Sequence, residues 1–311
     1  MKTIRRQRGA VLILLFVALV MGTLTVILAA LNNNSPQLRD RRNKVVEMRE
    51  VKEALLAYAL TYPDYHDIAP VTNAQKGPGR LPCSDTDNDG LMNCNTNAIG
   101  LGRLPQRILP PIGSPIALSD RYVGTGQQFW YAVAPAFREN SNMLNTSSTT
   151  NFTVDNPAVT DIAAVIIAPG PSLDGQVRNN GNQAARYLES SNVTGPNFVS
   201  NDATNPSLLN DMVETITVAE IMSYATTRVA QEIKRVLDIV GVPYPADATQ
   251  FNAAMTANAA PWVAANNWMT AAPLTYTNPS ATTATVQFSN CAIVFSFDQA
   301  QNGFTRSQRS C

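Results

Sequence analysis

The longest apolar segment of the chain runs from Ala10 to Leu31 without a charged residue, and its only hydroxyl side chains are Thr23 and Thr25. As a helix this segment would measure about 33 Å, slightly more than the ~30 Å hydrocarbon core of a bilayer. The pattern therefore predicts a transmembrane helix over residues 10–31.

A second helical pattern follows over residues 32–62, after a soft break at Asn32–Pro36. Apolar side chains recur there at steps of three and four residues, which places them on one face of a helix. They are Val45, Met48, Val51, Leu55, Tyr58 and Ala59. Charged side chains occupy the opposite face, so we expect this amphipathic half to pack on a globular head.

The remaining residues, 63–311, carry signals for both helices and strands. The apolar run over 161–168 ends at a Pro-Gly-Pro and predicts a buried strand. Thr217 and Glu220 form a capping box, which predicts a helix from there to about Val240, before Gly241. Residues 282–288 and 292–297 predict two strands of a hairpin.

Other stretches of the head are less periodic. We expect a short core helix over residues 127–138 and surface loops over 139–160 and 190–210. The whole pattern predicts an α+β fold, with a long N-terminal helix packed on a C-terminal head domain that contains an antiparallel sheet.

Composition and charge exclude one class of partner. Lys and Arg together number 23, as do Asp and Glu, and charged residues make up only 15% of the chain. This balance gives no basic footprint for nucleic acid. Four basic residues precede the apolar run, which favours a cytoplasmic N-terminus: Lys2, Arg5, Arg6 and Arg8.

The four cysteines fall into two local pairs, Cys83 with Cys94 and Cys291 with Cys311. In an oxidising compartment such spacing indicates two small disulfide loops. Other connectivities remain open, but local closure is favoured because it costs the least chain entropy. A Cys₄ zinc site is the rival interpretation, and the wide spacings disfavour it.

The stretch from Arg5 to Leu14 resembles the processing signal of type IV prepilins, a basic leader that ends in Gly and precedes an apolar helix. The resemblance implies cleavage by prepilin peptidase between Gly9 and Ala10, followed by N-methylation of Ala10. Two alternatives stay open: an uncleaved signal anchor, and an ordinary signal-peptidase cut near Ala29-Ala30.

The sequence departs from the bulk subunits of this family at one position. Major pilins carry Glu at the fifth mature position, where this chain has Leu14. The K-type minor pseudopilin of type II secretion also lacks this acid. Three short segments further along resemble a group of large prepilin-type proteins: Gly102–Pro105, Trp130–Val133 and Ile167–Gly170.

These features together predict a pilin-like, non-enzymatic minor pilin or pseudopilin of a type IV pilus or type II secretion system, which primes or caps a filament. The expected domains are a leader (1–9), a transmembrane assembly helix (10–31), its amphipathic continuation (32–62) and a periplasmic or extracellular head (63–311). The partners implied are other subunits, prepilin peptidase and the bacterial inner membrane. A tip adhesin that uses loops of 139–210 and a signal-anchored periplasmic protein are the alternatives.

An aspartate-rich loop over residues 83–95 carries the one candidate for metal chemistry. Asp85, Asp87, Asp89 and Gly90 match the first half of a DxDxDG calcium loop, in which alternate oxygens point at one centre. The carbonyl of Leu91 and the side chain of Asn93 would complete a Ca²⁺ site. An EF-hand ends with Glu at its twelfth place, where this chain has Thr96. The alternative is a turn with solvated carboxylates.

Catalytic signals are weak. The chain has one histidine, His66, and no GxSxG elbow to partner it. We therefore expect no enzymatic activity.

Overall fold

The computed structural model describes most of the chain after residue 6. The described segments are 7–66, 76–94, 99–108, 116–117, 128–141, 143–155, 158–178, 181–200, 208–269, 274–307 and residue 311. Within the first helix, side chains are described at 19–23, 25 and 39–65. The chain divides into two compact units, Met1–Met48 and Arg49–Cys311.

Helix α1 (Gln7–His66) runs through the end of the first unit into the second. In the first unit its described side chains at 39–47 are mostly exposed, and Asp40 pairs with Lys44 one turn later at 3.1 Å. In the second unit, Val51, Leu55, Tyr58 and Tyr62 recur along one face and are buried. This spacing matches the helical period, so α1 contributes a continuous apolar face to the core.

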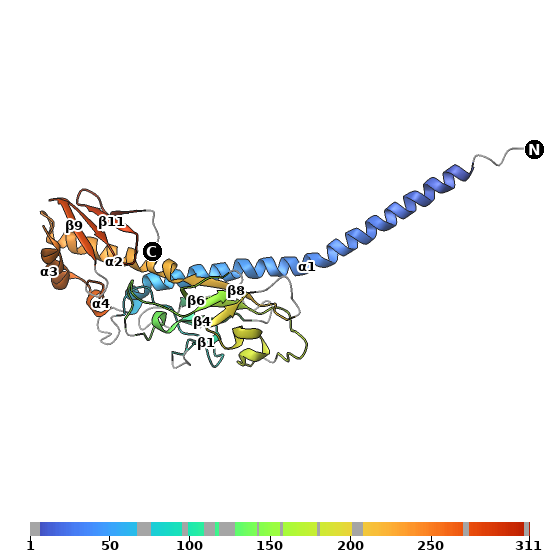
Figure 1. Ribbon diagram of the computed structural model, residues 1–311, viewed down its shortest axis with the longest axis horizontal. Coiled ribbons are helices and arrows are strands. Elements are labelled where there is room, and N and C mark those ends of the chain that lie inside the picture. The colour runs from blue at the N-terminus through green and yellow to red at the C-terminus, as the bar shows by residue number, and fades with distance from the viewer. Residues whose placement is uncertain are drawn as a thin grey trace, which may run out of the picture. The chain divides into compact units, whose positions relative to one another are not determined.

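The first sheet has four antiparallel strands in the order β1-β4-β6-β8, seen side by side in Figure 1. They are β1 (Leu101–Arg103), β4 (Trp130–Val133), β6 (Ile162–Ala168) and β8 (Met212–Thr217). Every residue of β6 is buried. An uninterrupted apolar run forms this strand because both of its faces are covered.

The second sheet also has four antiparallel strands, in the order β12-β11-β10-β9. They are β9 (Thr275–Ser280), β10 (Thr283–Gln287), β11 (Val294–Asp298) and β12 (Phe304–Arg306). Buried residues alternate with more exposed ones along β10 and β11. One face of this sheet therefore belongs to the core, as the period of a strand predicts.

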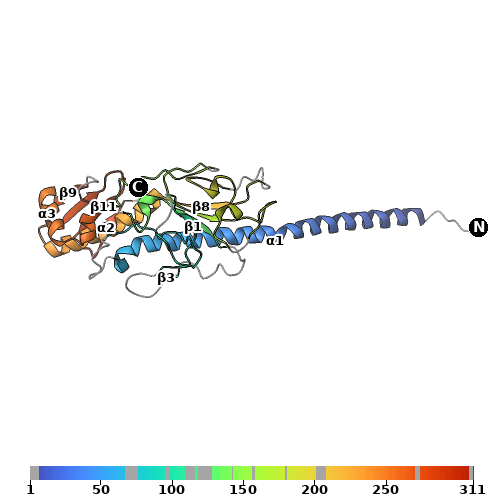
Figure 2. The ribbon, with the colours of Figure 1, turned by 90° about the horizontal axis from the view of Figure 1, so that it is seen from below.

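Three helices follow the first sheet in sequence: α2 (Val218–Val240), α3 (Ala248–Asn258) and α4 (Pro261–Ala265). The capping box of α2 is formed, with the Thr217 hydroxyl accepting from the Glu220 N–H and the Glu220 carboxylate accepting from the Thr217 N–H. On the second sheet, Arg306 donates to the hydroxyls of Ser223 and Thr227 of α2. Figure 2 shows α3 beside β9.

Smaller elements complete the described architecture. Strand β2 (Arg107–Ile108) pairs with β3 (Ile116–Ala117), and β5 (Thr153–Asp155) pairs in parallel with β7 (Asn197–Val199). Three 3₁₀ helices are η2 (Pro135–Phe137), η3 (Ala184–Arg186) and η4 (Ser190–Val193). Phe152 and Phe198 are fully buried, so the segments expected to be surface loops supply core side chains.

One part of the predicted fold is wrong. We expected a pilin-like fold whose long N-terminal helix has a transmembrane first half. Over the described parts of the chain, no helix is both long and apolar enough to cross a bilayer. The described side chains of α1 from Arg39 to Glu53 carry charges on every turn, and charged side chains are costly in hydrocarbon. The fold is mixed α and β, and the described residues form two four-stranded antiparallel sheets in place of the one sheet expected.

Two further expectations concern residues that the structure describes only in part. Of the predicted transmembrane run 10–31, side chains are described only at 19–23 and 25. Gly9 and Ala10, the predicted processing site, lie outside the described side chains, and so does His66.

The prediction of a helix over 127–138 is wrong, because strand β4 and helix η2 occupy this segment.

Candidate metal site

The aspartate-rich loop is closed by a disulfide and held at its base by strand β1. Cys83 and Cys94 are bonded to each other, with Cα atoms 5.1 Å apart. The N–H of Asp85 donates to the carbonyl of Arg103 at 2.9 Å, and the N–H of Arg103 donates to the main-chain carbonyl of Asp85 at 2.7 Å. These bonds fix the first aspartate of the loop against the sheet.

Two residues with positive φ form the turn itself, Asn88 at 66° and Gly90 at 86°. Both angles lie in the left-handed region, which Gly and Asn tolerate best. The carbonyl of Gly90 accepts from the N–H groups of Gln106 and Arg107, so the far side of the turn is also tied to the chain after β1.

Asp85 is 1% exposed, and its carboxylate lies inside this turn. Its Oδ1 accepts from the N–H groups of Asp87 and Asn88, and its Oδ2 accepts from the N–H of Gly90 at 2.8 Å. Burial raises the pKa of Asp85, while the hydrogen bonds from Gly90 and Asn88 oppose this rise. A cation beside this carboxylate would also lower its pKa, because a nearby positive charge favours the ionised form.

Asp87 and Asp89 are more exposed, and their carboxylate oxygens lie with that of Asp85 within 4.8 Å of one another. In the part of the chain that the structure describes, this is the one group of at least three acidic, histidine or cysteine side chains close enough to share a metal ion. Three carboxylates are the donor set of a hard divalent cation such as Ca²⁺ or Mg²⁺. The residues present therefore fit such an ion, without distinguishing calcium from magnesium.

The two remaining predicted ligands have different positions. The amide oxygen of Asn93 accepts from the N–H of Thr86 at 2.8 Å, and its amide nitrogen donates to Asp87 Oδ2 at 3.4 Å. The N–H of Leu91 donates to Asp89 Oδ1 at 2.8 Å. Asn93 thus stabilises the loop with the oxygen that was predicted to bind the ion.

The second disulfide joins Cys291 to Cys311, so all four cysteines form the two local pairs. Both bridges belong to the second unit. Neither contributes a thiolate for zinc, because each sulfur is bonded to another sulfur.

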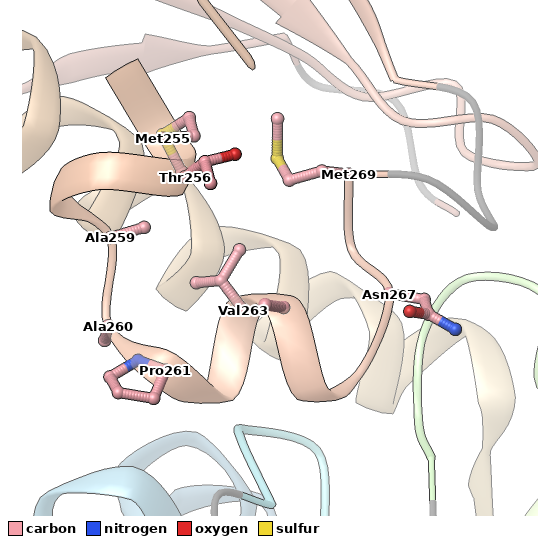
Figure 3. Close-up of a pocket in the computed structure, with 9 residues that line it drawn as sticks. Met255, Thr256, Ala259, Ala260, Pro261, Val263, Asn267 and Met269 are labelled. Carbon is pink, nitrogen blue, oxygen red and sulfur yellow. The ribbon is translucent and has the colours of Figure 1, made fainter. Parts of the chain in front are cut away.

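A separate cavity of about 470 Å³ lies between α3 and α4. Figure 3 shows Met255, Val263 and Met269 around it. Among the described residues the lining contains no titratable side chain, and two of its polar side chains bond elsewhere: Thr256 donates to the carbonyl of Asn252, and Asn267 to Met143 Sδ.

Sequence patterns gave no sign of three further acidic side chains, of which Glu139 is half-buried and Glu189 and Asp211 are buried. Burial raises the pKa of Glu139 to about 7. The hydroxyl of Tyr58 donates to Glu139 Oε2 at 3.3 Å. Asp211 and Glu189 lie together in a different part of the second unit. Nothing in the local sequence marks these residues, because the groups that surround them are distant in the chain.

Comparisons with protein-family models, with curated proteins and with solved structures find no match to this chain. The interpretation of the site therefore depends on its own residues.

Proposed function

We propose that this chain is a non-enzymatic minor subunit of a bacterial filament of the type IV pilus or type II secretion class. The observation that carries the proposal is the junction at Gly9, where a basic leader meets an uncharged apolar run that starts at Ala10. Prepilin peptidase would cut at this junction and leave the apolar residues on the mature subunit.

Leu14 supports a minor rather than a bulk role. The acid that bulk subunits carry at this position would be buried among apolar helices and needs a charged partner there. A subunit with Leu14 brings no such acid, and a position that primes or caps the filament does not require it. The partners would be other filament subunits, with the inner membrane as the site of processing.

The disulfides support export of residues 63–311. Bonds such as Cys83–Cys94 persist in oxidising compartments and are rare in the cytosol. We therefore propose that the head lies in the periplasm or outside the cell, where calcium is abundant enough to fill a weak site at Asp85, Asp87 and Asp89.

Coexpression with prepilin peptidase tests the proposal. We expect the chain to lose residues 1–9 when the peptidase is present, and we expect Gly9→Val to remain full length. Gly22→Val is the matched control, because a side chain at Gly22 meets nothing within 4 Å. It should be processed like the wild type. Equal processing of the Gly9 variant and the wild type would show that the proposal is wrong.

A further inference from the structure

Two buried acids that are distant in sequence are joined by a reciprocal pair of hydrogen bonds, in which the main-chain N–H of each donates to the carboxylate of the other. Glu189 precedes η4 and Asp211 precedes β8. The N–H of Glu189 donates to Asp211 Oδ2 at 2.9 Å, and the N–H of Asp211 donates to Glu189 Oε2 at 3.2 Å. This reciprocal arrangement, here called the carboxyl clasp, places the two side-chain carboxyl groups against each other.

Neighbouring polar groups tie further segments to the clasp. Gln176 donates to Glu189 Oε1 at 3.0 Å, and the Asn192 amide donates to Asp211 Oδ2 at 3.0 Å. Asn192 also exchanges two hydrogen bonds with the main chain of Val199 in β7. The clasp thus joins the loop before η3 to η4, β7 and the start of β8.

The charges around the clasp do not balance if both acids are ionised. Glu189 is 6% exposed and Asp211 is fully buried. Among the described residues, the guanidinium that faces them is that of Arg178, 3.9 Å from Glu189 Oε1, and it donates to the carbonyls of Gly170 and Tyr187. A second guanidinium, that of Arg103, stacks on Tyr187, with its Cζ 4.1 Å from the centre of the ring, and it lies near Arg178. One facing cation against two buried carboxylates leaves an excess negative charge, which is costly in a low-dielectric interior.

An unsatisfied oxygen marks where a proton would reside. Among the described residues, Asp211 Oδ1 is buried and has no donor that reaches it. Buried acceptors are almost always paired. A protonated Asp211 would satisfy this atom, because its O–H could donate to the Glu189 carboxylate.

We propose that Asp211 and Glu189 share one proton in the native protein at neutral pH, and that this proton keeps the carboxyl clasp closed. The clasp is then a pH-sensitive device that joins residues 170–178, 187–192, 199 and 210–211. It is independent of the filament role and of the metal loop.

The direction of titration agrees with this geometry. Burial, and then the negative charge of Glu189, raise the pKa of Asp211 to about 8. In the open or unfolded chain an Asp titrates near its ordinary value of about 3.9. The closed state therefore binds more protons between these values. Its stability is fully present below about pH 4 and is lost as the pH rises toward about 8.

Hydrogen exchange at the amides of Glu189 and Asp211 tests the proposal, because both amides donate directly to the clasp. After correction for the intrinsic pH dependence of exchange, we expect their protection to fall about tenfold per pH unit between about pH 5 and 7. In Asp211→Asn an amide replaces the group that carries the shared proton, so protection should not change with pH. In Glu189→Gln burial still raises the pKa of Asp211 while the negative charge of Glu189 is lost, so protection should fall over a narrower pH range than in the wild type. Asp174→Asn removes an exposed acid from a turn of the same region and should keep the wild-type slope.

Equal slopes in the wild type and in Asp211→Asn would overturn the proposal. If both clasp variants fail to fold, the carboxyl ¹³C resonance of Asp211 in the wild-type protein decides. A midpoint near pH 8 supports the shared proton, and full ionisation by pH 6 excludes it.

Discussion

At the residue scale, the three aspartates of the loop differ in their contacts. One is hydrogen-bonded within the turn, and the other two have carboxylates that an ion can reach. Asp85 satisfies three backbone N–H groups of its own turn, whereas Asp87 and Asp89 carry their carboxylates toward solvent. An ion held by all three would be bound to the native loop and not to the unfolded chain. Such an ion must therefore stabilise the protein.

Calcium titration followed by thermal unfolding checks this consequence. At ten times its Kd, calcium should stabilise the wild type by about 1.4 kcal/mol, a rise of several degrees in Tm. Asp87→Asn should lose most of this rise, and the exposed Asp174→Asn should retain it. An identical Tm in calcium and in chelator would exclude the site, and an equal response to magnesium would exclude selectivity for calcium.

Gly102 is a second residue on which the loop depends. A Cβ at this position would lie 2.4 Å from the carbonyl oxygen of Asp85, so the close approach of β1 to the loop requires glycine. We expect Gly102→Ala to lower the free energy of unfolding by about 1–3 kcal/mol in denaturant titration. Gly303→Ala, where the new methyl meets nothing within 4 Å, should change it by less than ~0.5 kcal/mol. Equal effects of the two substitutions would contradict this account.

Local spacing predicted the three aspartates because alternate residues of a tight turn point the same way. It could not assign Asn93, whose amide bonds Thr86 and Asp87 at once. The clasp residues Glu189 and Asp211 were also beyond local prediction, since their surroundings are created by the tertiary fold.

At the scale of elements, helix α2 is the clearest case of agreement between sequence and structure. Its capping box, its buried stripe and its end at Gly241 all have local causes. Lys52 of α1 adds a long-range tie, because its ammonium lies 2.7 Å from Glu220 in the capping box and 3.3 Å from Glu214 in β8. The start of α2 is thus fixed by local and tertiary contacts together.

Thr217→Ala measures the local part of this arrangement. Loss of the hydroxyl that accepts from the Glu220 N–H should cost about 1 kcal/mol in equilibrium unfolding. Thr256→Ala removes an exposed hydroxyl that bonds within α3 and should change stability by less than ~0.5 kcal/mol. A negligible loss in Thr217→Ala would mean that the tie to Lys52 alone positions the helix.

Strand β4 shows why the expected helix over 127–138 was wrong. Phe129, Trp130, Val133 and Phe137 recur at helical spacing, but all four residues of β4 are buried. The segment lies between β1 and β6, and pairing on both edges determines its conformation. Such non-local pairing overrides a weak local preference.

At the scale of the whole molecule, sequence pattern identified the element types of the head better than its architecture. The runs that form β6, β10 and β11 were recognisable, because a buried strand and a hairpin have local periodicity. The division into two four-stranded sheets was not, because the order β1-β4-β6-β8 depends on pairings between residues that are 27 to 55 positions apart in the chain. The pilin-like part of the fold prediction was wrong, because no helix of the described residues is both long and apolar enough to cross a bilayer.

The central claim concerns processing at Gly9, and the most direct measurement is the N-terminus of the mature protein. Mass spectrometry of the N-terminal peptide, from protein purified out of bacterial envelopes that contain prepilin peptidase, gives this terminus. The account predicts a chain that begins at Ala10 and carries one methyl group on its amine. A chain that begins at Met1, or near Ala30, would contradict it.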